Sequence, residues 1–371
     1  MVVFPTLQTL SSTVSNFSGV SYYPRSMPTT YVQNFLFSVQ HEFAGNLLLD
    51  TSYVYTRGRN LNFQTNVNQA PISAFGCTGY NCGNPNPIFN DIQAQIYDGY
   101  SNYNALQLRL QKRVSYGLSF QVNYAWSKWL DTGTGGGHGS GIDIYQNAFD
   151  PSANYGLSDG NAANTLVGQI VYEVPVGRGR RYAVPKYVEP VVGGWRVSTL
   201  FQWHSGTPFT PVIQSGIATA LDPGLSASIN QGGSSLYPDV VGSASVSHRT
   251  NANWFNPAAF TNPAPGTFGD AGRNILTGPG FTNVDFSLAK EFALYESVKL
   301  EVRADMFDVF NHINWANPNN DVGIGCSLAL SSPPPCGAGQ GVPQLSNSTA
   351  GTITSTEGGT RIIQLGAHIK F

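Results

Sequence analysis

The segment Leu118-Ser-Phe-Gln-Val-Asn-Tyr-Ala-Trp126 alternates between large apolar and small or polar side chains, and this alternation decides the fold class. Successive side chains of a β-strand point to opposite faces, so a period of two places every large apolar residue on one face. Those residues are Leu118, Phe120, Val122, Tyr124 and Trp126. The segment is therefore predicted to be a strand with one apolar and one wetter face.

The same alternation recurs along the chain, and helical periodicity is nearly absent. The segment 104–113 is separated from 118–126 only by the turn around Ser115-Tyr116-Gly117, so the two segments are predicted to form a hairpin. Similar short turns follow the first and seventh predicted strands, and a basic connector containing Gly177-Arg178-Gly179-Arg180-Arg181 follows the fifth. The nine predicted strands are about 31–43, 46–57, 104–113, 118–126, 164–174, 194–204, 281–292, 297–310 and 360–371.

The length of these strands and the asymmetry of their connections favour a membrane barrel. Twelve residues span about 40 Å, which a tilt near 40° reduces to about 30 Å, the thickness of a bilayer. Short turns alternate with long Gly/Pro/Asn-rich loops, which are about 58–101, 130–161, 205–280 and 311–358. Outer-membrane barrels have short periplasmic turns and long extracellular loops. We expect an all-β fold, an antiparallel up-and-down transmembrane β-barrel that is only partly present in this chain.

The amino-acid composition agrees with a barrel whose strands have one apolar and one polar face. The chain has 371 residues, of which only 11% are charged, about half the usual share. Mean hydropathy is nevertheless only −0.14, because uncharged polar residues occupy the polar positions. No run of about 18 apolar residues predicts a transmembrane helix. A net charge of −2 gives no reason to expect nucleic acid as a partner.

Aromatic side chains cluster near the ends of the predicted strands, on the apolar face, as aromatic belts at membrane interfaces do. The outer belt is predicted to contain Tyr53, Tyr55, Tyr124, Trp126 and Trp203. The inner belt is predicted to contain Phe43, Trp195, Phe292 and Phe371. His41 and Lys290 also fall on the apolar face and are tolerable there only near an interface.

Ordered short motifs from about residue 28 to the end resemble the β-barrel of Oar-like TonB-dependent transporters. They include Tyr124-Ala-Trp-Ser-Lys, Asn154-Tyr-Gly-Leu-Ser-Asp, Ser205-Gly-Thr-Pro-Phe, Trp254-Phe-Asn-Pro-Ala-Ala-Phe, Gly269-Asp-Ala-Gly-Arg-Asn, Phe307-Asp-Val-Phe-Asn-His and the terminal Phe371. The resemblance implies a barrel of about 22 strands around an N-terminal plug, energised through TonB. Nothing in the chain resembles the plug, and Gly160-Asn-Ala-Ala-Asn replaces a basic run that the family commonly has after Asp159.

Strand parity also predicts that the chain is part of a larger barrel. Bacterial single-chain barrels have an even number of strands with both ends in the periplasm, so nine strands ending there imply at least one more upstream. The start of the chain also lacks the basic and apolar regions of a signal peptide. We therefore expect residues 1–30 to be an irregular segment or upstream loop, and residues 31–371 to be the C-terminal part of an outer-membrane β-barrel.

The four cysteines form two close pairs, Cys77 with Cys82 and Cys326 with Cys336, in Gly/Pro/Asn-rich segments predicted to lie outside the cell. This setting favours disulfides in an oxidising compartment. Zinc binding is the alternative, but no histidine flanks either pair at ligand spacing.

Other candidate chemistry is weaker. The six histidines are scattered, which argues against catalysis. The run 133–141 lacks the Lys-Ser/Thr of a phosphate-binding loop and is better interpreted as an external loop. Asp131, Asp143, Asp150 and Asp159 lack calcium-loop spacing and are better interpreted as a solvated loop face. The arginines at 178, 180 and 181 are expected to meet lipid head groups or the plug rather than nucleic acid.

These patterns together predict a non-enzymatic transport protein of the outer membrane, with no cofactor. The strands would form barrel wall, and the long loops would contact an unknown transported ligand. Expected partners are outer-membrane lipid, the missing plug and strands, TonB through that plug, and the barrel-assembly machinery, for which Phe371 resembles the C-terminal signal. The alternatives are a stand-alone porin-like or adhesin-like barrel and, disfavoured by strand length, a soluble carbohydrate-binding β-sandwich.

Overall fold

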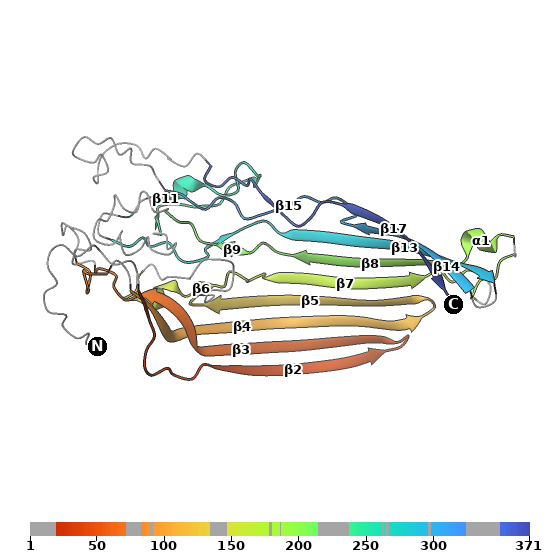
Figure 1. Ribbon diagram of the computed structural model, residues 1–371, viewed down its shortest axis with the longest axis horizontal. Helices are drawn as coiled ribbons and strands as arrows, with labels where there is room; N and C mark the ends of the chain where they lie inside the picture. Colours follow the sequence, from red (N-terminus) through yellow and green to blue (C-terminus); the bar gives the residue numbers. More distant parts are fainter. Residues whose placement is uncertain are drawn as a thin grey trace.

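The computed structural model describes residues 20–71, 83–89, 92–133, 147–177, 180–185, 187–213, 237–261, 263, 267–295, 298–323 and 349–371. All nine predicted strands are present and form one curved antiparallel sheet in the order β17-β14-β13-β8-β7-β5-β4-β3-β2 (Figure 1). Their bounds are β2 Tyr31–Phe43, β3 Leu47–Asn66, β4 Ile92–Ser115, β5 Leu118–Asp131, β7 Asn164–Glu173, β8 Trp195–His204, β13 Phe281–Tyr295, β14 Val298–Phe307 and β17 Ile362–Lys370. No described helix is long and apolar enough to cross a membrane.

Strands β3 and β4 are longer than predicted, at 20 and 24 residues. The prediction of a loop over 58–101 was therefore wrong at both of its ends. The pairing of β3 with β4 continues beyond the point where the alternation in the sequence ends. Its register shifts between Gly58 and Leu61 and again between Leu61 and Phe63. Such bulges change which face a side chain occupies, so the simple period of two is lost there. A short strand that was not predicted, β1 (Val20–Tyr22), pairs in parallel with the extension of β4.

The hairpin turns all gather at one end of the sheet, called here the short-turn end (Figure 1). Between β4 and β5, Tyr116 and Gly117 both have positive φ, at 53° and 82°, as the favoured two-residue hairpin turn requires. A Cβ on Gly117 would lie 2.2 Å from the carbonyl oxygen of Glu173, so the close approach of β7 also requires glycine. This end additionally has the short helix α1 (Glu189–Val192).

The opposite end, called here the long-loop end, holds the remaining small elements. Three two-residue strand pairs form there, together with strand β6 (Gly156–Leu157), which extends the large sheet beside β5. The pairs are β9 (Pro208–Phe209) with β12 (Leu276–Thr277), β10 (Asp239–Val240) with β11 (Phe260–Thr261), and β15 (Asn314–Trp315) with β16 (Thr356–Glu357). The 3-10 turns η2 (Pro151–Asn154) and η3 (Pro257–Ala259) complete this end.

The two outermost strands of the sheet, β2 and β17, each have one neighbour among the described residues. Every residue of β2 is exposed, and so are all but one of β17. Both strands have exposed large apolar side chains, including Leu36, which is 69% exposed, and Leu365, which is 82% exposed. Unpaired edges are the feature that closure of a barrel removes.

Candidate functional site

The large sheet has two chemically different faces. Along one cross-strand row, Thr51, Leu108 and Tyr124 lie side by side, and the row continues through Leu166 to Trp203. One residue further along each strand, Asp50, Arg109 and Asn123 form the neighbouring row, with Arg109 Nη2 at 2.8 Å from Asp50 Oδ2. We call the first the apolar face and the second the polar face.

An ion-pair network occupies the polar face at the short-turn end. Glu301 accepts hydrogen bonds from Arg196 at 3.0 Å and from Lys370 at 2.6 Å, and its side chain is only 7% exposed. Lys299 donates to Glu291 at 2.7 Å beside it. The strands β8, β13, β14 and β17 each contribute one or more of these charges. The network therefore links β8, β13, β14 and β17 through ion pairs, and all of its charged side chains lie on the polar face.

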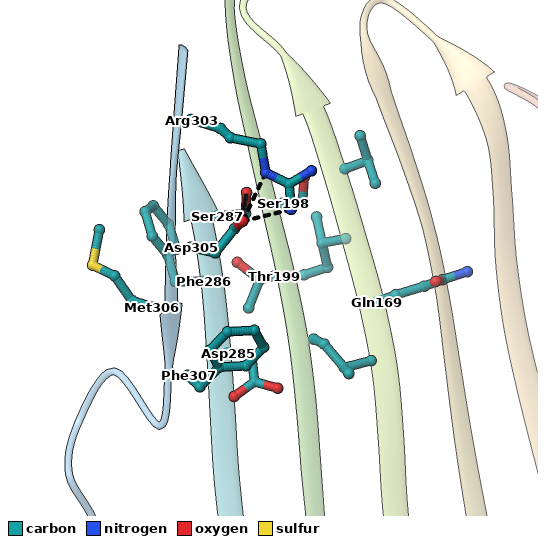
Figure 2. A pocket seen from close by; sticks show the side chains of 13 residues that line it. Gln169, Ser198, Thr199, Asp285, Phe286, Ser287, Arg303, Asp305, Met306 and Phe307 are labelled. Atoms are coloured by element: carbon teal, nitrogen blue, oxygen red, sulfur yellow. Dashed lines mark hydrogen bonds and ion pairs between the residues drawn. The ribbon is translucent and has the colours of Figure 1, made fainter. Parts of the chain in front are cut away.

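A shallow cavity of about 310 Å³ lies against β7, β8, β13 and β14 (Figure 2). Asp305 accepts hydrogen bonds there from Ser287 Oγ at 2.6 Å and from Arg303 Nε at 2.7 Å. These groups satisfy one another, so the charges of Asp305 and Arg303 are paired rather than arranged as a reactive cluster. Among the described residues, no group of three His, Cys, Asp or Glu side chains is arranged to hold a metal ion.

Lys290 is an exception on the apolar face, as the sequence predicted, and the structure explains how it is accommodated. Its amino group donates to the carbonyl oxygens of Val191 at 3.1 Å and Gly193 at 2.6 Å. The same nitrogen lies 4.6 Å from the ring centroid of Trp195 and 5.0 Å from that of Phe292. The segment containing α1 therefore covers this cation at the short-turn end, and Lys290 is only 7% exposed.

A buried polar cluster joins the loops at the long-loop end. Arg273 Nη1 donates to Asp131 Oδ1 at 2.6 Å, with side-chain exposures of 5% and 3%, and Arg273 Nη2 lies 3.3 Å from Asp159. Asn274 donates to Asp159 at 2.5 Å and to the carbonyl oxygen of Leu157 at 2.7 Å. The motifs at 154–159 and 269–274, which are far apart in sequence, thus meet here against the end of β5.

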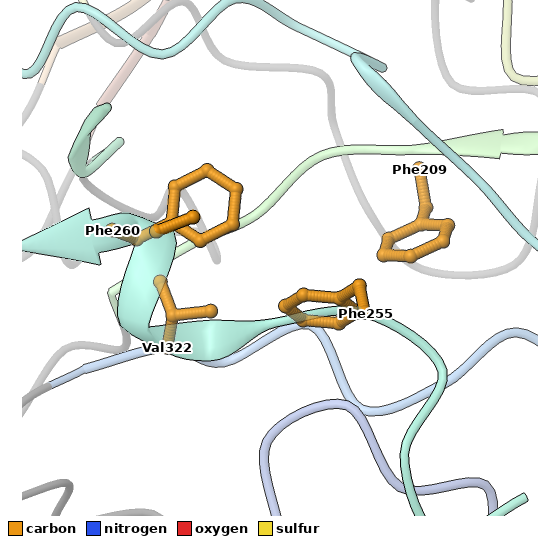
Figure 3. Close-up of a cluster of buried hydrophobic side chains, with 5 residues drawn as sticks. Phe209, Phe255, Phe260 and Val322 are labelled. Carbon is orange, nitrogen blue, oxygen red and sulfur yellow. The ribbon is translucent and has the colours of Figure 1, made fainter. Parts of the chain in front are cut away.

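A hydrophobic cluster lies among the same loops (Figure 3). The rings of Phe209 and Phe255 pack at a tilt with centroids 5.8 Å apart, and those of Phe255 and Phe260 pack edge to face at 6.1 Å. Ala259 and Val322 complete the cluster. The first ring belongs to the 205–209 motif and the next two to the 254–260 motif. We call this cluster and the Arg273 cluster together the loop scaffold, because their residues come from five loop segments that pack together at the long-loop end.

The predicted site residues fall into three groups. Cys77, Cys82, Cys326 and Cys336 lie outside the described residues, as do His138 and Asp143. The aromatic residues predicted for the two belts that lie within strands are on the apolar face. In the outer set, Tyr53 and Trp126 share one cross-strand row through Leu106, and Tyr124 and Trp203 share the next. Their role as interface anchors stays a prediction, as does the assembly signal at Phe371, which is 94% exposed directly after β17.

The interpretation of Asp131 as part of a solvated loop face was wrong, because its carboxylate is buried against Arg273. The sequence analysis also gave no role to Arg273 or Asn274. The motif Gly269-Asp-Ala-Gly-Arg-Asn was singled out only as part of the family resemblance, and its sequence does not show that the arginine is buried. Its partner Asp131 is 142 residues away, and no local pattern connects the two.

A family model described as an outer membrane beta barrel domain matches residues 2–364. No curated protein matches the chain. Similar solved structures include the outer membrane transporter YddB from Escherichia coli, at 8% identity and a TM-score of 0.44, with 94% of this chain and 33% of that one covered. Another is the FrpB iron transporter from Neisseria meningitidis, at 10% identity and a TM-score of 0.39, with 95% and 32% covered. The chain thus spans about a third of the length of these structures.

Proposed function

The chain belongs to the outer membrane beta barrel domain family, and from that premise we propose that residues 31–371 form part of the wall of a TonB-dependent transporter. The polar face lines the lumen, and the apolar face contacts lipid. The observation that carries the proposal is the separation of apolar and polar rows across β3, β4, β5, β7 and β8, in a sheet whose outermost strands each have one neighbour among the described residues. A lipid-exposed edge leaves backbone N–H and C=O groups unpaired at a cost of several kcal/mol each. Further strands beside β2 and β17 remove that cost.

The loop scaffold supports a receptor role at the outer surface. Its aromatic cluster and the buried Arg273–Asp131 pair hold described segments of several long loops together. A pre-organised surface binds a ligand with less loss of conformational entropy than mobile loops do. We propose that the long-loop end faces the outside, contacts the transported ligand, and passes it to a lumen whose access is controlled by a plug and TonB.

The transporter proposal predicts retention on TonB. The protein, extracted from native outer membranes in mild detergent with whatever strands or chains accompany it, is passed over the immobilised periplasmic domain of TonB. We expect it to be retained, while an unrelated porin from the same extract passes through. The photo-cross-linking amino acid benzoylphenylalanine at Leu36 or Leu365 is expected to cross-link each edge to polypeptide in the same preparation.

The two readouts separate the candidate functions. Cross-linked edges without retention on TonB would refute the energised transporter and favour a porin-like or adhesin-like barrel. Edges that cross-link to lipid alone would refute the closed wall itself. A matched position such as Leu108, which lies inside the sheet on the apolar face, should cross-link mainly to lipid.

A further inference from the structure

A groove of about 670 Å³ lies on the apolar face near the long-loop end. Tyr53, Leu106 and Trp126 form its floor as a single cross-strand row. Leu157 of β6 and Ala163, directly before β7, also line it. The volume falls within the roughly 300–1,000 Å³ typical of small-molecule sites. Because these residues lie on the apolar face, the groove opens toward the membrane rather than toward the lumen.

Two cations stand at the outer margin of this groove. Lys128 lines it, two residues beyond Trp126 on the same face, and pairs in register with Asn104. Arg57 lies in the next row on that face, opposite Asn102, and its Nε is buried without a hydrogen-bond partner. Within the described part of the chain, neither cation forms an ion pair with a carboxylate.

The contrast with other cations of the chain indicates that the missing counter-charge is external. On the polar face, Arg109, Arg196 and Lys299 each have a carboxylate at 3.0 Å or less. On the apolar face at the short-turn end, Lys112 donates to the carbonyl oxygen of Gly45 at 2.7 Å. Lys128 and Arg57 have neither arrangement. An apolar groove with unpaired cations above it fits a molecule with apolar chains below an anionic head.

We propose that the groove binds one phosphorylated, multiply acylated lipid of the outer leaflet. An acyl chain lies against Tyr53, Leu106 and Trp126, and a phosphate is held by Lys128 and Arg57, with the amide of Asn104 between them. Arginine and lysine bind phosphate through charge-assisted hydrogen bonds. This inference rests on the proposed orientation, in which the long-loop end lies at the outer surface.

The test measures lipid retained by the protein in its native assembly. After detergent exchange, the preparation is incubated with phosphatidylcholine nanodiscs containing diphosphoryl lipid A, and native mass spectrometry counts the bound lipid. We expect one lipid A per chain. The double variant Lys128→Gln/Arg57→Gln should bind it at least about tenfold more weakly, because each cation contributes to attraction of an anionic head group. Ala163→Phe, which fills the groove and leaves both cations, should also lose binding.

Matched controls make the outcome specific. Lys112→Gln removes a lysine from the same face at the other end of the sheet and should leave binding unchanged. Lys128→Arg should retain it. Equal binding of dephosphorylated lipid A, equal binding of phosphatidylglycerol, or full binding by the double variant would each overturn the proposal.

A separate labelling experiment distinguishes failure of this inference from failure of the orientation. Val241 is 63% exposed at the long-loop end, so Val241→Cys in intact cells should react with an impermeant thiol reagent. Labelling without lipid binding would refute the lipid site alone. Absence of labelling from outside would refute the orientation on which the proposed function depends.

Discussion

Replacing Arg273 with methionine is expected to destabilise the loop scaffold by about 3–5 kcal/mol, because the carboxylate of Asp131 would remain buried without its counter-charge. The loss should be local, since the strands pair independently of these loops. Limited proteolysis of intact cells would measure it, as faster cleavage of the long loops in the variant than in the parent protein. Hydrogen exchange of the segments around 154–159 and 208–213 should rise in parallel.

Two control variants define the cause. Arg180→Met removes an arginine whose pair with Glu173 is about half exposed on both sides, and such pairs contribute less than about 1 kcal/mol. The double variant Arg273→Met/Asp131→Leu removes both charges and should recover much of the protection, since apolar replacement of a buried pair is often neutral. Unchanged proteolysis of Arg273→Met would show that the cluster does not hold the loops.

The second large effect is expected from a charge placed on the apolar face. Val122 lies between Leu110 and Gly168 in the middle of the sheet, with its side chain on that face. Val122→Arg should destabilise the folded membrane protein by about 2–4 kcal/mol, the usual cost of arginine facing lipid near the midplane. The measurement is urea titration of the folded protein in native-lipid vesicles, read by the heat-dependent shift in gel mobility.

The neighbouring residue provides the control. Gln121 is flanked by Gln111 and Gln169 on the polar face, where water solvates a charge. Gln121→Arg should change the unfolding midpoint little. Equal destabilisation by the two arginines, or a larger effect at Gln121, would contradict the assignment of the faces.

The strands could be predicted from sequence because most residues in them follow the local alternation of apolar and polar side chains, with exceptions such as His41 and Lys290. Leu118 to Trp126 alternates because neighbouring positions meet different environments, and the structure places those positions on opposite faces. The rule fails where the backbone departs from regular pleating. Gly58, beside the bulges of β3, interrupts the alternation, so the outer parts of β3 and β4 could not be recognised.

The candidate site was less predictable, because its contacts join residues that are distant in sequence. The motif residues Asn154–Asp159 and Gly269–Asn274 were recognisable as a resemblance, but their meeting at Asp131 depends on the completed sheet. Lys290 is a similar case. The alternation predicted that Lys290 lies on the apolar face. It could not predict that its amino group donates hydrogen bonds to carbonyl oxygens of a connector almost 100 residues earlier.

The most direct measurement of the central claim, that this sheet is a membrane wall with a wet and a lipid face, is a cysteine scan along β5. In a background with the four native cysteines changed to serine, single cysteines replace residues 119 to 124 in turn. Positions 119, 121 and 123 should react with an impermeant thiol reagent, and positions 120, 122 and 124 only with a lipid-soluble one. Reaction without this alternation, at all six positions or at none, would contradict the account.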